Sequence, residues 1–391
     1  MDSIARKMSK KSDGYHLVKV LFLFTEAGLL DFIKSIFGRI TRPSSDENDW
    51  LYPVPDYDNE PMKIKIIATE LVQVISTVPI FDTLPNGTKV YNLLAVTDMD
   101  KDAKSGEGWT WRAVTRRGKL AITKDKRNVS ITWNLGSDRN LTTHLNAKGR
   151  AMELSDLSEF NGRLISPDDK TGMLYEIKDN KAIPWLFLNS GPGNTTHGMK
   201  AEWTTIKGNY LYVGGHGVEY RNKNGTVLNE DAMWIKIVSK RGEVRSINWK
   251  GVYERVRGAV NITAPGYLTH EAVLWSPQRR KWFFLPRKES KTIYNEMEDE
   301  RKGTNLLIIG NPLLTKFKVV RVGNVKHPER GFSAFEFIPG TKDRLIVALK
   351  SEEVDNQPAA SYVTVFDING SVILDDQKLE QQYKFEGIYF V

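Results

Sequence analysis

The chain has 391 residues, of which 40% are hydrophobic and 27% charged, with a net charge of +8 and no cysteine. This apolar content is sufficient for a folded core, which excludes a wholly disordered chain. The absence of cysteine excludes disulfide scaffolds, cysteine-ligated zinc sites, iron–sulfur clusters and thiol catalysis.

The positive charge is concentrated near the start of the sequence. Residues 1–45 carry eight basic and four acidic side chains and so account for half of the net charge. The remaining residues are close to balanced and lack the basic stripe that tracks a phosphodiester backbone. We therefore expect no nucleic-acid partner.

The N-terminal extension, residues 1–45, contains one apolar segment. Leu17–Phe24 follows the basic stretch Lys7–Lys11, an order typical of a signal sequence or anchor. If the segment is extended to Ile40, it includes the charged residues Asp31 and Lys34. It therefore falls short of the roughly 20 apolar residues that a membrane-spanning helix needs. An amphipathic surface helix explains the pattern equally well. A targeting segment, an N-terminal membrane anchor and a surface helix all stay open.

Seven Asn-x-Ser/Thr sequons occur where composition predicts about three. They begin at Asn86, Asn128, Asn140, Asn194, Asn224, Asn261 and Asn369. This excess predicts a glycoprotein of the secretory pathway, either resident in the endoplasmic reticulum or Golgi lumen or secreted.

Residues 41–65 are rich in Pro, Asp, Glu and Ser, so we assign residues 46–87 to a linker and lead-in, whereas residues 88–391 predict one all-β domain. No helical periodicity is evident past residue 90. Close to twenty short β-branched and aromatic runs, separated by turn signals, are too many for one sandwich but suit the four-stranded blades of a β-propeller. The clearest runs are Val90–Val96, Trp109–Thr115, Val129–Trp133, Tyr210–Val213, Trp234–Val238, Ala272–Trp275, Trp282–Leu285, Leu306–Ile309, Phe335–Ile338, Leu345–Leu349, Tyr362–Phe366 and Ile388–Val391.

The first acidic cluster, Asp98-Met-Asp100-Lys-Asp102, follows the first of these runs. Its spacing resembles the start of an EF-hand loop, but Ala103 stands where that loop needs glycine and Trp109 where it needs glutamate. A solvated loop and a contribution to a divalent-cation site remain alternatives.

A second acidic cluster includes Glu153 and Asp156, and Asp168 and Asp169 follow it. Carboxylates gathered in this way repel one another unless a cation lies among them. Their spacing is consistent with a hard-cation or polyphosphate site, and equally with Asp-rich turns.

Three glutamates stand within bulky apolar segments: Glu202, Glu271 and Glu386. A buried glutamate is costly unless it is paired or binds a metal. In a propeller, the three could converge on one ion with oxygen ligands, for which calcium is suited. Arg287 and Arg301 offer forked donors to phosphate, although surface ion pairs would leave the same pattern.

Nine colinear segments resemble the calcium-activated nucleotidases, the family of animal apyrases, and the resemblance runs from about residue 88 to the C-terminus. These segments are Lys148–Leu157, Asp168–Gly172, Lys200–Trp203, Pro265–Glu271, Arg280–Arg287, Asp299–Gly303, Gly331–Ser333, Ala348–Glu353 and Phe385–Gly387. Residues 1–87 lie outside the resemblance.

The resemblance implies a five-bladed β-propeller with a central calcium site, preceded by the N-terminal extension. It also implies calcium-dependent removal of the terminal phosphate from nucleoside di- and triphosphates such as UDP, GDP, ADP or ATP. Carried over residue by residue, the implied calcium ligands are Ser155, Glu202, Glu271, Ser333 and Glu386.

The same resemblance places further residues in the nucleotide cleft. The carboxylates expected to orient water or accept its proton are Asp98, Asp100, Glu153 and Asp156. The residues expected to contact substrate are Asp168, Asp169, Lys200, Arg287 and Arg301. This chain departs from the family pattern at Lys170, at Ala334 and at His216, and we expect the last to bear on base preference.

A second function class stays open, because one fold hosts many functions. The alternative is a calcium-stabilised propeller that binds a ligand without turnover. Nucleotide preference and homodimer formation are also open.

Overall fold

The structure is a computed structural model that describes residues 81–391 except 107, 223–224 and 381–382. The described residues belong to the second of two units, residues 78–391. The predicted N-terminal extension, residues 1–45, and nearly all of the lead-in, residues 46–87, lie outside the described residues. No helix in the described part of the chain has the length and apolarity required of a transmembrane span.

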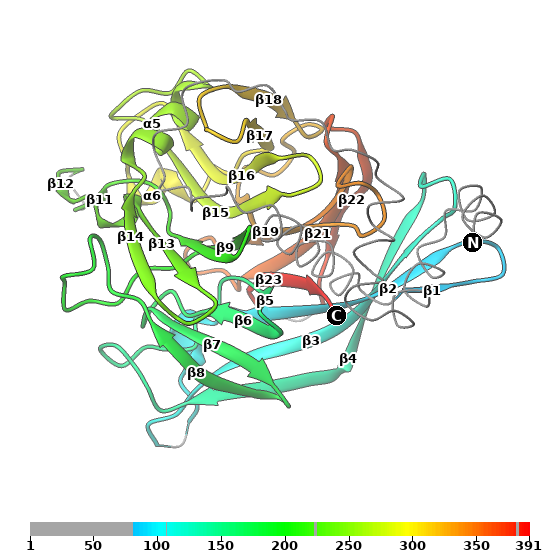
Figure 1. Ribbon diagram of the computed structural model, residues 1–391, viewed down its shortest axis with the longest axis horizontal. Coiled ribbons are helices and arrows are strands. Elements are labelled where there is room, and N and C mark those ends of the chain that lie inside the picture. The colour runs from blue at the N-terminus through cyan, green and yellow to red at the C-terminus, as the bar shows by residue number, and fades with distance from the viewer. Residues whose placement is uncertain (1–80, 107, 223–224, 381–382) are drawn as a thin grey trace, which may run out of the picture. The chain divides into compact units, whose positions relative to one another are not determined.

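Five antiparallel sheets form the blades of a β-propeller (Figure 1). Blade 1 contains β23 (Phe385–Phe390), β2 (Lys89–Thr97), β3 (Trp111–Ile122) and β4 (Val129–Thr143), with β1 (Phe81–Thr83) paired to the start of β2. Blade 2 contains β5 (Ser158–Phe160), β6 (Arg163–Pro167), β7 (Met173–Lys178) and β8 (Lys181–Phe187). Blade 3 contains β9 (Trp203–Lys207), β10 (Tyr210–Gly214), β13 (Trp234–Ser239) and β14 (Val244–Asn248).

The last two blades follow the same pattern. Blade 4 contains β15 (Tyr267–Ser276), β16 (Lys281–Ser290), β17 (Leu306–Gly310) and β18 (Phe317–Arg321). Blade 5 contains β19 (Arg330–Phe337), β20 (Leu345–Glu352), β21 (Ala360–Asp367) and β22 (Val372–Lys378). A short separate ribbon pairs β11 (Tyr220–Arg221) with β12 (Val227–Asn229). The predicted all-β, five-bladed fold is confirmed.

The first strand of each blade lies nearest the axis. Strands β5, β9, β15, β19 and β23 contact one another around it. In blade 1 this place belongs to the C-terminal strand β23, which pairs antiparallel with β2 from Leu93 opposite Phe390 to Thr97 opposite Phe385. The ring is therefore closed by strands from the two ends of the described chain.

The position of a strand within its blade explains its composition. The middle strand β20 is buried from Leu345 to Ser351 because other blades cover both of its faces. None of the residues of the outermost strands β8, β14 and β22 is buried, and polar side chains are frequent in β14 and β22. These edges suit the outside of a propeller, where no further strand pairs with them.

Five apolar clusters fill the spaces between consecutive blades. One joins blades 1 and 5, and the others join blades 3 and 4, 4 and 5, 1 and 2, and 2 and 3. Apolar side chains thus pack blade against blade, which leaves the axis to polar residues.

Two short helices accompany the strands, and neither is long enough to contradict the lack of helical periodicity past residue 90. Helix α5 (Lys250–Gly258) packs Tyr253 and Val256 into the cluster between blades 3 and 4. A second helix, α6 (Glu296–Asp299), has a single turn that begins at an Asn295 cap. Nine residues and four residues are too few for a helical period to stand out in the sequence.

Candidate active site

The five implied calcium ligands are distributed one to each blade. Each lies on, or a few residues before, the innermost strand, and none is more than 5% exposed. They are Ser155 before β5, Glu202 before β9, Glu271 in β15, Ser333 in β19 and Glu386 in β23. The propeller geometry therefore directs five oxygen-bearing side chains from distant parts of the sequence toward one axis.

Basic side chains lie between the three glutamates of this set. His216 Nε2 is 3.0 Å from Glu202 Oε1 and 2.9 Å from Glu271 Oε1. Arg287 Nη1 donates to Glu271 Oε2 at 2.5 Å and to Glu386 Oε1 at 3.0 Å. The carboxylates are thus linked across the axis by cations of the protein itself.

These contacts shift the pKa values of the participating groups. Burial disfavours charge on His216, but the Glu202 and Glu271 carboxylates overcome it and raise the imidazole pKa to about 9. Burial likewise opposes ionisation of Glu202, but His216 and Lys200 hold its pKa well below the usual range. For Glu386, burial prevails and the pKa is well above the usual range. Glu386 therefore holds its proton more tightly than an exposed glutamate does.

The donor set fits a hard divalent cation such as calcium. Ser155 Oγ is buried and has no hydrogen-bond partner among the described residues, an arrangement that calls for an explanation such as an ion. Ser333 Oγ makes one long contact, 3.5 Å to the Phe385 carbonyl oxygen. Carboxylate and hydroxyl oxygens in this number are the ligands that calcium prefers.

A carboxylate triad, formed by Asp98, Glu153 and Asp169, lies beside this set. One oxygen from each lies within 4.8 Å of the others, and all three side chains are buried. A backbone bridge pairs Asp98 with Glu153, and the Asp169 amide donates to the Glu153 carbonyl at 3.0 Å. The triad therefore unites the end of β2 with two segments of blade 2.

Each acid of the triad has a basic partner. Arg150 donates to both oxygens of Glu153, from Nε at 2.7 Å and from Nη2 at 2.6 Å. Lys384 Nζ is 2.6 Å from Asp98 Oδ2, and the Lys200 ammonium contacts Asp169. Asp169 Oδ1 is buried without a hydrogen-bond partner among the described residues. One acceptor of the triad is thus available to a ligand.

The acids of the triad hold their protons more tightly than usual. Burial raises the Asp98 pKa to about 6, with Asp169 and Asp100 adding repulsion and Lys384 opposing it. Burial raises the Glu153 pKa to about 8, reinforced by the charges of Asp169 and Asp98. Positive charge entering this region would relieve the repulsion.

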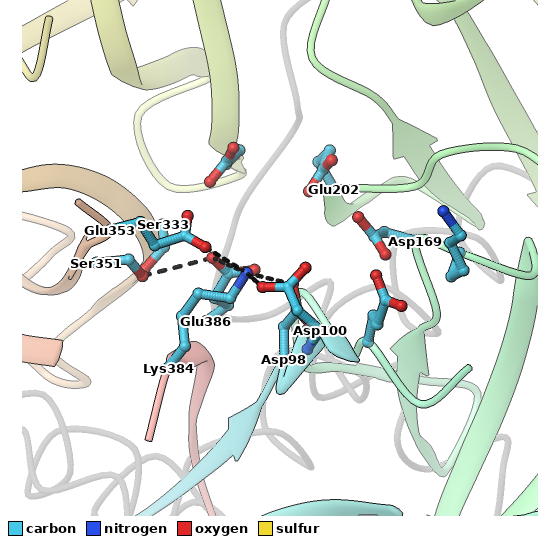
Figure 2. A network of polar contacts seen from close by, with 12 residues as sticks. Asp98, Asp100, Asp169, Glu202, Ser333, Ser351, Glu353, Lys384 and Glu386 are labelled. Atoms are coloured by element: carbon cyan, nitrogen blue, oxygen red, sulfur yellow. Dashed lines mark hydrogen bonds and ion pairs between the residues drawn. The ribbon is translucent and has the colours of Figure 1, made fainter. Parts of the chain in front are cut away.

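Two lysines join the triad to the implied calcium ligands. Lys200 Nζ contacts Asp169 and lies 2.6 Å from Glu202 Oε1. Lys384 Nζ contacts Asp98 and lies 3.7 Å from Glu386 Oε1. Figure 2 shows Lys384 beside Asp98 and Glu386, with Glu202 and Asp169 across the centre of the view. The two groups form one continuous charged centre.

Asp100 lies at the rim of this centre, with its side chain 42% exposed. Its Oδ1 accepts from Arg150 Nη2 at 2.7 Å, and its Oδ2 accepts from Lys384 Nζ at 2.5 Å. Among the predicted catalytic carboxylates, it is the one that solvent reaches most easily.

Three predicted site residues have other surroundings. The Asp156 carboxylate accepts from the backbone and hydroxyl of Thr204, at 2.7 and 2.8 Å, and so links blades 2 and 3. The Asp168 carboxylate caps its own turn, accepting from Thr171 Oγ1 at 2.8 Å and from nearby amides. Arg301 is exposed just past α6. Within the described part of the chain, none of these three forms an ion pair with the charged centre.

The sequence analysis missed several groups of the centre. Arg150 and Lys384 were not singled out, and neither was Glu353, which contacts Arg287 and lies 3.1 Å from Lys384 Nζ. His216 was noted only as a departure. Each stands inside or beside a recognised segment, for example Lys384 two residues before Glu386, and that proximity was the available signal.

Comparison with known proteins is consistent with this geometry. The profile of the apyrase family matches residues 99–391. Apyrase apy-1 of Caenorhabditis elegans is 51% identical over 78% of this chain and 85% of its own length. Soluble calcium-activated nucleotidase 1 of Rattus norvegicus is 44% identical over 78% of this chain and 75% of its own. The apyrase of Cimex lectularius is 38% identical over 81% of this chain and 87% of its own length. This chain belongs to the apyrase family.

Proposed function

We propose that this protein is a calcium-dependent hydrolase that releases the terminal phosphate of nucleoside di- and triphosphates. The observation that carries the proposal is the buried axis itself, where oxygen donors from all five blades adjoin a carboxylate triad with basic partners. The names of its relatives, apyrase and calcium-activated nucleotidase, support a nucleotide-hydrolysing activity and a role for calcium.

In this proposal, Ser155, Glu202, Glu271, Ser333 and Glu386 hold the calcium ion. When bound, calcium would neutralise charge and polarise oxygens of the phosphate chain. Hydrolysis of a phosphoanhydride depends mainly on charge stabilisation and on a positioned water, which the protein's own groups supply.

The basic side chains bind the phosphates in our proposal. Lys200 and Arg287 are held beside implied calcium ligands by contacts to Glu202 and Glu271, so they are already at the centre. Arg150 and Lys384 are likewise held beside the triad, by their contacts to Glu153 and Asp98. Their donors can exchange a carboxylate partner for a phosphate oxygen without leaving the site.

The triad positions the attacking water and takes its proton. Asp98, Glu153 and Asp169 offer closely spaced acceptors, and Asp169 Oδ1 has no partner among the described residues. A water between these oxygens would be oriented by at least two acceptors.

The direct test measures phosphate release from UDP, GDP, ADP and ATP, first with calcium and then with a chelator. We expect release that the chelator abolishes and calcium restores. Glu202→Gln should raise the calcium concentration for half-maximal rate at least about tenfold, because a ligand charge is lost.

Glu176→Gln is the matched control, since Glu176 makes only a partly exposed ion pair with Arg163 at 3.3 Å. Release that persists unchanged in chelator would contradict the calcium requirement. No release from any of the four nucleotides would favour the alternative, a calcium-stabilised binding module.

We further propose that the protein enters the secretory pathway. The six sequon asparagines within the described residues are all exposed, which an oligosaccharide requires. They are Asn86, Asn128, Asn140, Asn194, Asn261 and Asn369. The apolar segment that would direct the chain there lies outside the described residues.

A further inference from the structure

The His216 imidazole lies beside two of the implied calcium ligands. Its Nε2 is 3.0 Å from Glu202 Oε1 in blade 3 and 2.9 Å from Glu271 Oε1 in blade 4. One nitrogen and one oxygen from each acid lie within 4.8 Å of one another. The three side chains therefore form a mixed nitrogen and oxygen donor set, unlike the all-oxygen set implied by the family resemblance.

The loop that carries His216 is fixed by close packing. At Gly214 a Cβ would lie 2.0 Å from the Trp203 ring. At Gly217, where φ is +72°, a Cβ would lie 2.4 Å from the Tyr253 ring. Only glycine allows the chain to pass these two aromatic side chains, so the loop that presents His216 has little freedom to move.

Hydrogen bonds and stacking fix the same loop from the other side. The His216 carbonyl accepts from the His270 amide at 2.9 Å, which ties the loop to the residue before Glu271. Tyr253 stacks on the His270 ring with centroids 5.3 Å apart. The imidazole is thus presented to the two carboxylates by a rigid support, as effective metal ligands are.

We propose that His216 is a metal ligand, and that the centre of this protein accepts borderline divalent cations such as Mn²⁺, Co²⁺ or Zn²⁺ in addition to calcium. The inference rests on the proposed metal centre at Glu202 and Glu271 but adds a ligand and an ion class to it. Imidazole favours these metals over calcium, which takes oxygen almost exclusively.

The competing explanation is that His216 only hydrogen-bonds the two glutamates and moves aside when an ion binds. In that case the metal would contact oxygen alone. Pulsed electron paramagnetic resonance of Mn²⁺ on the full chain separates the two, because it detects the magnetic coupling of a directly bound nitrogen.

With one equivalent of Mn²⁺, we expect a ¹⁴N coupling in the unmodified protein and its loss in His216→Gln. The exposed His197 supplies the control His197→Gln, which should keep the coupling. Protein labelled with ¹⁵N-histidine gives the same answer without any substitution, since the coupling must change from ¹⁴N to ¹⁵N. Bound Mn²⁺ with no histidine nitrogen coupling, or no Mn²⁺ binding at all, would overturn the proposal.

Calorimetric titration provides the second measurement. The ratio of Mn²⁺ affinity to Ca²⁺ affinity should fall at least about tenfold in His216→Gln, and an unchanged ratio would refute the role of His216. Neither readout depends on hydrolysis. Failure to release phosphate would therefore count against the proposed function but not against His216 as a ligand. A missing nitrogen coupling in an active, calcium-dependent enzyme would count against His216 as a ligand but not against the proposed function.

Discussion

Each buried acid at the propeller axis contacts a lysine, arginine or histidine, several of them from another blade. Arg287 in blade 4, for example, contacts Glu271 of its own blade and Glu386 of blade 1. Such a network is internally compensated, and calcium and a phosphate chain would enter it together. The acidic side chains would then contact the metal and the basic side chains would contact the phosphates. Few buried charges would therefore lose a partner.

The first prediction concerns Glu153, which lies between Arg150 and the other two acids of the triad. Glu153→Gln keeps the side-chain shape but removes a proton acceptor. We expect the turnover rate to fall about 10²- to 10⁴-fold, measured as phosphate release at saturating calcium and nucleotide. The effect of calcium on thermal stability should persist, because the implied calcium ligands are untouched.

The same substitution at Glu176, in the same blade, should leave the rate within about twofold, as expected of a surface change. A Glu153→Gln enzyme of normal turnover would remove the triad from the mechanism.

The acids of the site could be predicted from the sequence, and most of the cations could not. A glutamate such as Glu202 or Glu386 stands out because it interrupts an apolar strand. A lysine such as Lys384 does not, since lysines are common at strand ends. Its role depends on which strand ends of other blades lie opposite, and that is a property of the closed ring.

At the scale of elements, the closure of blade 1 depends on more than the pairing of β2 with β23. The buried Arg116 in β3 donates from Nε and Nη2 to both oxygens of Asp138, each at 2.7 Å. Its Nη1 donates at 2.7 Å to the carbonyl of Glu380, and its guanidinium lies 5.0 Å from the Phe385 ring centroid. One side chain therefore ties the middle of the blade to the segment that leads into β23.

Replacing Arg116 should weaken this closure. Arg116→Met removes the fork and leaves Asp138 without its partner, and we expect the free energy of unfolding to fall by about 3–5 kcal/mol. Chemical denaturation followed by tryptophan fluorescence measures it. Arg112→Met is the comparison, since Arg112 lies on the same strand and donates to Asn140 at 3.2 Å near the surface. Equal losses in the two variants would show that Arg116 has no special part in closure.

Strands were predicted better than helices for a physical reason. Runs such as Leu345–Leu349 are apolar throughout because both faces are covered, and the observed β20 includes all of that run. The long strand β3 extends to Ile122, beyond the predicted Thr115, since Arg116 is buried through its ion pair with Asp138. When a charged residue lies inside a strand, a prediction based on the polarity of the sequence ends the strand too early.

At the scale of the whole propeller, the apolar clusters join only neighbouring blades, whereas the implied calcium ligands come from all five. A bound ion would therefore connect all five blades at one point, including blades that share no apolar cluster. Ligand binding to the folded state adds stability in proportion to the logarithm of ligand concentration.

Calcium should accordingly raise the melting temperature. At a hundredfold excess over the dissociation constant the gain is about 2.7 kcal/mol, which corresponds to roughly 5 °C for a domain of this size. Differential scanning fluorimetry with calcium and with chelator measures the shift. The double variant Glu202→Gln, Glu271→Gln should lose it. An equal shift in that variant would place the ion elsewhere.

The exposed sequons lead to a prediction about N-linked glycosylation. Expression through a eukaryotic secretory pathway should give a protein whose mass falls on enzymatic removal of N-linked glycans. Mass spectrometry should locate glycans at asparagines in turns, such as Asn86 and Asn369. An unmodified protein recovered from that route would contradict the proposed glycosylation.

The pairing of β2 with β23 also has a consequence for synthesis on the ribosome. Strand β2 emerges early, but its inner neighbour is made only after strands β3 to β22. At about 5–20 residues per second, this leaves one edge of an apolar strand unpaired for on the order of tens of seconds. The nascent chain must remain protected from aggregation during that interval, and the proposed metal centre would be incomplete until Glu386 has been translated.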